Sequence, residues 1–261
     1  NLLNSFDNKG KIIKAVDFSS DGKYLLAAGF DKEIKVFDAQ KFKKVKTLKG
    51  HEDRILTACF SPDGKYILSG GSDNKVMLWD VNTGKQVKTF DKHYDMVSKV
   101  RFTPDGKQII TAGWDKNIFL WDIQTGKMVK SLTGLFYPVY SACFSGNDEF
   151  AIIGSGTYAR LWDFKNGKSL KTFRGHSHII TSCDFSSDNR KVVTGSLDKT
   201  AKVWSVMLGT ELKTLSGHTK EIYSVAFSPD DKTIASGGDN MLLWDASTGV
   251  KLKDFKVGKN D

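Results

Sequence analysis

The stretch GHEDRILTACFSPDGKYILSGGSDNKVMLWD, residues 50–80, decides the fold. It contains three short apolar runs, at 55–60, 66–69 and 76–79, and a fourth follows at 86–90. A Ser-Pro-Asp-Gly turn, a turn containing Asp73 and an Asn-Thr-Gly turn separate them. Short apolar runs bounded by such residues predict four β-strands. One unit of this size cannot bury both of its faces, so we expect copies of it to stack.

Copies of this unit recur along the whole chain. An aromatic residue, usually followed by Asp, closes each copy: Phe37, Trp79, Trp121, Trp162, Trp204 and Trp244. Successive members of this series are 42, 42, 41, 42 and 40 residues apart. The six three-strand units begin near Ile13, Ile55, Val97, Val139, Ile180 and Ile222. Fourth-strand segments lie near 43–48, 85–90, 127–132, 168–173, 210–215 and 249–255. A period of this length predicts an all-β array of repeats.

The Gly-His opening, the Ser-Pro-Asp-Gly turn and the Trp-Asp ending at this period resemble the WD40-repeat family over nearly all 261 residues. The resemblance implies a β-propeller of six four-stranded blades around a central channel. Residues 2–6 look like an isolated fourth strand, and in the family such an N-terminal strand usually completes the last blade. Six blades closed end to end are therefore favoured, and part of a seven-bladed ring is the alternative. Because the repeats continue without a linker, we expect residues 1–261 to form a single domain, and excision of this domain from a longer chain is left open.

Composition limits the classes of function. The cysteines Cys59, Cys143 and Cys183 all lie in first strands, where equivalent positions point the same way around the array rather than at each other. Free thiols fit a reducing compartment, so we expect a cytoplasmic protein, with the nucleus as the alternative. No apolar run is long enough to cross a membrane and no signal peptide precedes the first strand, so no membrane partner is expected.

The formal net charge of +9 raises the question of nucleic acid. Most of the basic residues are Lys, and many of these lie on the fourth strands, where lysine protects an exposed sheet edge. Specific reading of bases or phosphates favours Arg, so specific nucleic-acid binding is disfavoured. Weak binding of polyanions or nucleic acid through a lysine-rich rim is the alternative function.

The resemblance implies a buried hydrogen-bond tetrad in several blades, formed by His before the first strand, Ser or Thr on the second, Asp in the next turn and Trp on the third. The tetrads are His51, Ser69, Asp73 and Trp79; His93, Thr111, Asp115 and Trp121; and His176, Thr194, Asp198 and Trp204. The sixth repeat has His218, Ser236 and Trp244, and Asp239 takes the acidic role only if the register shifts by one. The fourth repeat departs from the pattern, with Leu135, Ile152 and Gly156.

Serine, histidine and aspartate also occur together in acyl-transfer enzymes. A catalytic constellation is needed once, however, whereas this set recurs with a Trp whose indole N–H requires a buried acceptor. The tetrads therefore predict structural networks and no catalytic residue. Histidines separated by whole blades cannot converge on one ion, so we expect no metal and no cofactor.

In the family, partners most often dock on the loops before the first strands and on the turns between second and third strands. The fourth repeat carries aromatic residues in that loop where other repeats are polar, and we expect neighbouring aromatic residues to extend the patch. The predicted contact residues are Tyr94, Met96, Trp114, Phe136, Tyr137, Tyr140, Tyr158 and Tyr223. Packing of this loop over a blade without a tetrad is the alternative. The sequence thus predicts a non-catalytic scaffold that binds a protein or peptide, as a subunit or domain of a larger assembly.

Overall fold

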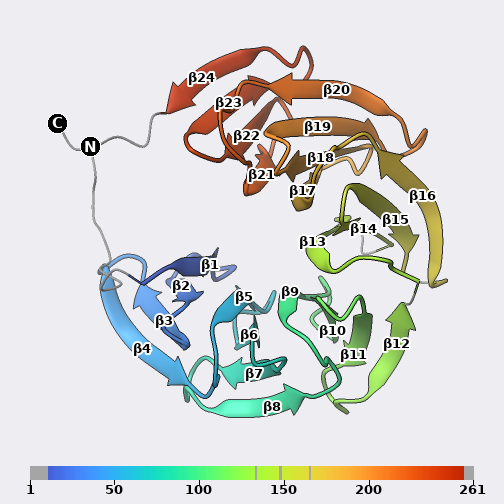
Figure 1. Ribbon diagram of the computed structural model, residues 1–261. Coiled ribbons are helices and arrows are strands. Elements are labelled where there is room, and N and C mark those ends of the chain that lie inside the picture. The colour runs from blue at the N-terminus through green and yellow to red at the C-terminus, as the bar shows by residue number, and fades with distance from the viewer. Residues whose placement is uncertain (1–10, 133, 147–148, 165, 256–261) are drawn as a thin grey trace. The chain divides into compact units, whose positions relative to one another are not determined.

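The computed structural model describes residues 11–132, 134–146, 149–164 and 166–255 (Figure 1). Within these ranges the chain forms six four-stranded antiparallel sheets and no helix, which confirms the predicted fold class of a six-bladed propeller of WD40 type. The chain divides into two compact units, residues 1–134 and 135–261, with three sheets in each. The isolated strand predicted for residues 2–6 lies outside the described residues.

The first unit contains three sheets whose strands follow one another in chain order. The first sheet is β1 (Ile13–Phe18), β2 (Tyr24–Gly29), β3 (Glu33–Asp38) and β4 (Lys43–Lys49). The second is β5 (Ile55–Phe60), β6 (Tyr66–Gly71), β7 (Val76–Asp80) and β8 (Gln86–Phe90). The third is β9 (Val97–Phe102), β10 (Gln108–Gly113), β11 (Ile118–Asp122) and β12 (Met128–Leu132).

The second unit repeats this arrangement. The fourth sheet is β13 (Val139–Phe144), β14 (Phe150–Ser155), β15 (Tyr158–Asp163) and β16 (Lys168–Arg174). The fifth is β17 (Ile180–Phe185), β18 (Lys191–Ser196), β19 (Thr200–Ser205) and β20 (Glu211–Ser216). The sixth is β21 (Ser224–Phe227), β22 (Thr233–Gly237), β23 (Met241–Asp245) and β24 (Lys251–Phe255), and its first strand begins two residues later than predicted. The backbone N–H of Ile222 instead donates to the Ser196 carbonyl of the fifth sheet at 3.1 Å.

The Ser-Pro-Asp-Gly turn shows how local chemistry produces these hairpins. The Ser61 hydroxyl donates to Asp63 Oδ1 at 2.7 Å and accepts the backbone N–H of Tyr66 at 2.9 Å. Asp63 Oδ1 also accepts the N–H of Lys65 at 3.1 Å. Gly64 has φ of +70°, a conformation that glycine adopts without steric cost. The turn therefore closes the β5–β6 hairpin through its own side chains.

The apolar core lies between successive sheets of a unit. Leu26 and Ile34 of the first sheet pack in one buried cluster with Ile55, Ile67 and Trp79 of the second sheet. Similar clusters join the second and third sheets, the fourth and fifth, and the fifth and sixth. Each unit is therefore stabilised by stacking of sheets that individually have no closed core.

Candidate functional site

The tetrad of the third sheet is a continuous buried network. His93 Nδ1 lies 2.8 Å from Asp115 Oδ2, and His93 Nε2 lies 2.8 Å from Thr111 Oγ1. The Trp121 indole N–H donates to the same hydroxyl at 3.0 Å. Because a carboxylate only accepts, Nδ1 carries the imidazole hydrogen and Nε2 accepts the Thr111 O–H. The network fixes the loop before β9 and the turn after β10 against β11.

The second and fifth sheets contain the same network. His51 lies 2.8 Å from Asp73 and 2.8 Å from Ser69, which accepts the Trp79 N–H at 2.8 Å. In the fifth sheet the corresponding bonds of His176 to Asp198 and Thr194 measure 2.7 and 2.8 Å, and Trp204 donates at 2.8 Å.

In the sixth sheet Asp239 takes the acidic position with a longer contact. His218 Nδ1 lies 3.3 Å from Asp239 Oδ1, while its Nε2 lies 2.7 Å from the Ser236 hydroxyl. Trp244 donates to that hydroxyl at 2.8 Å. The shorter turn before β23 therefore retains the network with a weaker histidine–carboxylate contact.

Burial and hydrogen bonding act in opposite directions on the pKa values of the titrating groups in these networks. Burial raises the pKa of Asp115, but the hydrogen bond and charge of His93 outweigh burial and leave that pKa below its ordinary value. Burial lowers the pKa of His176, against the opposing effect of Asp198. The Thr111 and Thr194 hydroxyls are fully buried and already bonded, so a substrate cannot reach them. This arrangement supports the loops and offers no exposed nucleophile.

The fourth sheet replaces the network with apolar contacts. Leu135 and Ile152 are buried where the second, third, fifth and sixth sheets have His and Ser or Thr. Trp162 is also buried, and its indole N–H has no hydrogen-bond partner among the described residues. The loss of the tetrad residues from the fourth sheet thus leaves the Trp162 indole N–H without a hydrogen bond among the described residues, which lowers the free energy of unfolding by about 1–3 kcal/mol.

This difference predicts unequal results for two identical substitutions. Trp204→Phe removes a hydrogen bond from the buried Thr194 hydroxyl, so we expect a loss of about 1–2 kcal/mol in unfolding free energy. Trp162→Phe removes a donor with no described partner, so we expect a smaller loss or a gain. Chemical denaturation of both variants checks this expectation. Equal destabilisation by the two substitutions would contradict it.

In the first unit the predicted contact residues lie at the loop ends of β9 and β10. Tyr94 is 73 % exposed, and its hydroxyl donates to the Asp115 carbonyl at 3.0 Å. Met96 and Trp114 are half-buried, and the Trp114 backbone N–H donates to the Met96 carbonyl at 2.8 Å. The Tyr94 ring therefore lies exposed on the surface, and the hydrogen bond of its hydroxyl fixes it to the turn after β10.

In the second unit Phe136 is 70 % exposed, Tyr137 and Tyr223 are also exposed, and Tyr140 is half-buried. The prediction that Tyr158 presents a surface to a partner is wrong, because its side chain is only 6 % exposed. The Tyr137 ring covers it, with ring centroids 6.2 Å apart.

Tyr137 itself is partly a packing residue. A Cβ added at Gly156 would lie 3.0 Å from the Tyr137 ring, so the ring sits directly on this glycine. Gly156 occupies the position of the tetrad aspartate, and its lack of a side chain makes room for the ring. In this loop the Tyr137 side chain thus packs on the fourth sheet, while the Phe136 side chain remains exposed to solvent.

Sequence reasoning missed two arginines beside this loop. The guanidinium carbons of Arg160 and Arg174 each lie 5.3 Å from the centroid of the Tyr158 ring. The sequence could have indicated them, because two of the few arginines of the chain lie on the third and fourth strands of the aberrant fourth repeat. Antiparallel pairing of Tyr158 with Arg174 brings them together.

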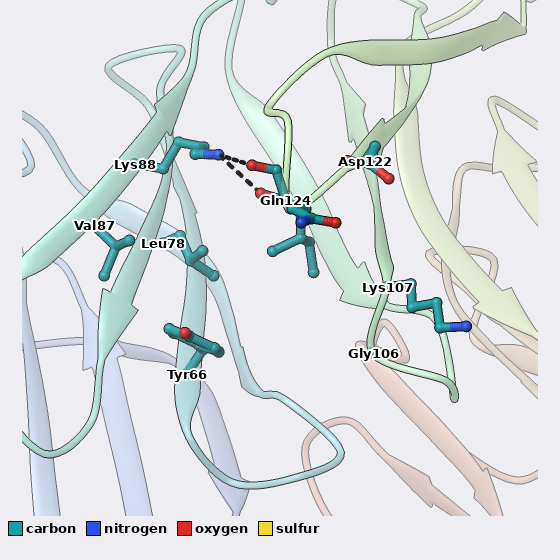
Figure 2. A pocket seen from close by; sticks show the side chains of 9 residues that line it. Tyr66, Leu78, Val87, Lys88, Gly106, Lys107, Asp122 and Gln124 are labelled. Carbon is teal, nitrogen blue, oxygen red and sulfur yellow. Dashed lines mark hydrogen bonds between the residues drawn. The ribbon is translucent and has the colours of Figure 1, made fainter.

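A pocket of about 460 Å³ lies between the second and third sheets of the first unit. Figure 2 shows the Lys88 side chain reaching from β8, where its ammonium donates to the carbonyls of Ile123 and Gln124 at 2.9 and 3.0 Å. Asp122 accepts the N–H and O–H of Thr125, both at 2.7 Å. These polar groups are engaged in holding a turn, and the rest of the lining is largely apolar.

The lysines of the outer strands therefore do more than protect an edge. Lys46 on β4 repeats the Lys88 arrangement, because its ammonium donates to the carbonyl of Val81 at 2.8 Å and to that of Asn82. Each of these two lysines joins its own sheet to the turn of the next sheet in the unit.

The described residues were compared with what a metal site or a reactive thiol requires. No group of three or more His, Cys, Asp or Glu side chains there could hold a metal ion. None of the three cysteines forms a disulfide, and burial raises the pKa of Cys59 to about 12, which keeps this thiol protonated. The described residues also include no helix of the length and apolarity needed to span a bilayer.

Stacked four-stranded sheets with a repeated His-Ser/Thr-Asp-Trp network define a propeller protein built from sequence repeats. A family model described as "WD domain, G-beta repeat" matches residues 1–38, 42–80, 84–122, 167–205 and 209–245, which is more than half of the chain. The chain belongs to the WD40-repeat family, and the longest unmatched interval, residues 123–166, contains the first three strands of the aberrant fourth repeat. No curated protein matches the chain. Repeats of this family generally mediate protein–protein interactions as scaffolds, and its propellers are typically not enzymes.

Proposed function

We propose that this protein is a non-catalytic scaffold that holds a protein or peptide partner on the loops before its first strands, as a subunit or domain of a larger assembly. The observation that carries the proposal is the exposure of Phe136 on such a loop, with Tyr137 beside it. Large aromatic side chains at solvent-facing loops favour partner binding, because their burial in a complex removes much apolar area from water. Tyr94 presents a similar exposed ring on the corresponding loop of the first unit.

The test compares two pairs of exposed side chains in the second unit. Phe136→Ala with Tyr137→Ala removes the aromatic loop. Met207→Ala with Leu208→Ala is the matched control, because this apolar pair is at least as exposed and lies in the turn between β19 and β20, at the other end of the strands. Quantitative affinity purification should recover one set of proteins with the wild type and the control, and lose it with the aromatic-loop variant.

Both variants should first be shown to melt like the wild type, since Tyr137 also packs on Gly156. A Phe136→Ala single variant, which removes only the more exposed ring, separates packing from binding. Recovery of the same partners with all variants would refute the proposed face.

A further inference from the structure

The pocket between the second and third sheets lies on a different surface from the proposed partner face. It borders the turns that follow β9 and β11, at the opposite end of those strands from the loop that carries Tyr94. In Figure 2 Tyr66, Leu78 and Val87 lie on one side of it and Gly106 lies on the other. Its volume of about 460 Å³ is within the range of about 300–1,000 Å³ that is typical of ligand sites.

The pocket offers mainly apolar surface, because two of its three charged side chains are already engaged. The Lys88 ammonium donates to two carbonyls of the turn after β11, and Asp122 accepts the N–H and O–H of Thr125. The Ile123 side chain is half-buried here, whereas its counterpart between the first and second sheets, Val81, is only 6 % exposed. The second boundary in this unit therefore leaves more apolar surface open to a ligand than the first.

The strand beside the pocket, β8, has an open edge. It is the last strand in the order β5-β6-β7-β8, and among the described strands it pairs only with β7. The outer edge of such a strand carries backbone N–H and C=O groups that a further strand can pair with, and lysines commonly protect it. The corresponding strand β4 reads KKVKTLK and has four lysines, whereas β8 reads QVKTF and has one. The β8 edge is thus the less protected of the two.

We propose that the pocket binds an extended segment of a protein partner, which pairs with the edge of β8 and places every second, apolar side chain in the pocket. Strand addition supplies main-chain hydrogen bonds, and a pocket beside the edge selects alternate side chains. Acidic residues that flank the apolar positions complement Lys107, which lines the pocket and is exposed. The formal net charge of +9 also favours an acidic partner.

The test uses a fluorescein-labelled heptapeptide of alternating glutamate and leucine, whose binding is measured by anisotropy. A peptide with serine for leucine should bind about tenfold more weakly or worse, because it buries less apolar area. A peptide with glutamine for glutamate should bind more weakly at low salt, and added salt should reduce this difference by screening the charges.

Two matched double variants locate the site. Val87→Trp with Lys107→Glu fills the mouth of the pocket and reverses its charge, so it should weaken binding by about tenfold or more. Val45→Trp with Lys65→Glu makes the same changes at the counterpart positions of the first boundary and should weaken binding by less than about twofold. All four positions are exposed, so both variants should melt like the wild type.

The contribution of β8 is tested by methylating every backbone nitrogen of the glutamate–leucine peptide. This peptide keeps its side chains but has no main-chain donor to pair with a strand edge. It should bind about tenfold more weakly than the parent peptide, because hydrogen bonds to β8 are lost.

Equal weakening by the two double variants, undiminished binding of the methylated peptide, or no measurable binding of the parent peptide would overturn the inference. Self-association of the wild type that Val87→Trp abolishes would also overturn it, since that result assigns the pocket to a second copy of this chain. Neither Phe136 nor Tyr137 lines the pocket, so failure here leaves the purification with the aromatic-loop variant unaffected.

Discussion

Replacing Trp121 with alanine is expected to lower the free energy of unfolding by about 3–5 kcal/mol. The indole is buried between two phenylalanines, with centroid distances of 5.4 Å to Phe90 and 5.7 Å to Phe119. Its N–H also donates to the buried Thr111 hydroxyl. Alanine leaves a cavity between the second and third sheets and an unbonded hydroxyl, and both effects act in the same direction. Chemical denaturation followed by circular dichroism measures the change.

Two controls separate the contributions. Trp121→Phe keeps an aromatic ring in the site and should lose only part of the stability, about 1–2 kcal/mol, through the hydrogen bond. Trp114→Ala removes an indole that is half-buried in a turn and should cost less than Trp121→Ala. A near wild-type unfolding midpoint for Trp121→Ala would contradict its place in the core.

Replacing His93 with leucine should destabilise the protein by about 3–5 kcal/mol, because one partner of a buried pair is lost. Asp115 would keep the backbone N–H groups of Asn117 and Tyr94, at 3.1 and 3.3 Å, and a side-chain hydrogen bond of Asn117. In the wild type His93 holds the pKa of Asp115 below its ordinary value, so this carboxylate's stabilisation is lost as pH falls through that lowered pKa. Without His93, burial raises the pKa of Asp115 and favours its protonated form. The deficit of the variant should therefore shrink as pH falls toward about 4.

The fourth sheet supplies the matched comparison. A triple variant with His93→Leu, Thr111→Ile and Asp115→Gly installs in the third sheet the residues found at Leu135, Ile152 and Gly156. It leaves no buried charge without a partner, so it should unfold at a higher denaturant concentration than His93→Leu alone. If the triple variant is as unstable as the single one, the uncompensated carboxylate is not the cause of the loss.

Most of the strand pattern could be predicted from the sequence because its determinants are local. The Ser61–Asp63–Gly64 turn forms its own hydrogen bonds, and the neighbouring apolar run became β6 from Tyr66 onward. The tetrad residues could also be assigned, since their spacing repeats with the strands. The start of β21 was misplaced by two residues, and the N–H of Ile222, at the predicted start, donates to the Ser196 carbonyl of the preceding sheet.

The sequence by itself determined the repeat, the number of four-stranded sheets and the identity of the tetrads, because turn chemistry and alternation act over a few residues. Only the tertiary structure decided which aromatic side chains of the fourth repeat face solvent. Tyr158 is buried because Gly156 lets the Tyr137 ring lie against it, while Phe136 remains outside. The pairing of β15 with β16 then places Arg174 beside the Tyr158 ring. Strand register fixes this contact between residues that are not neighbours in the sequence.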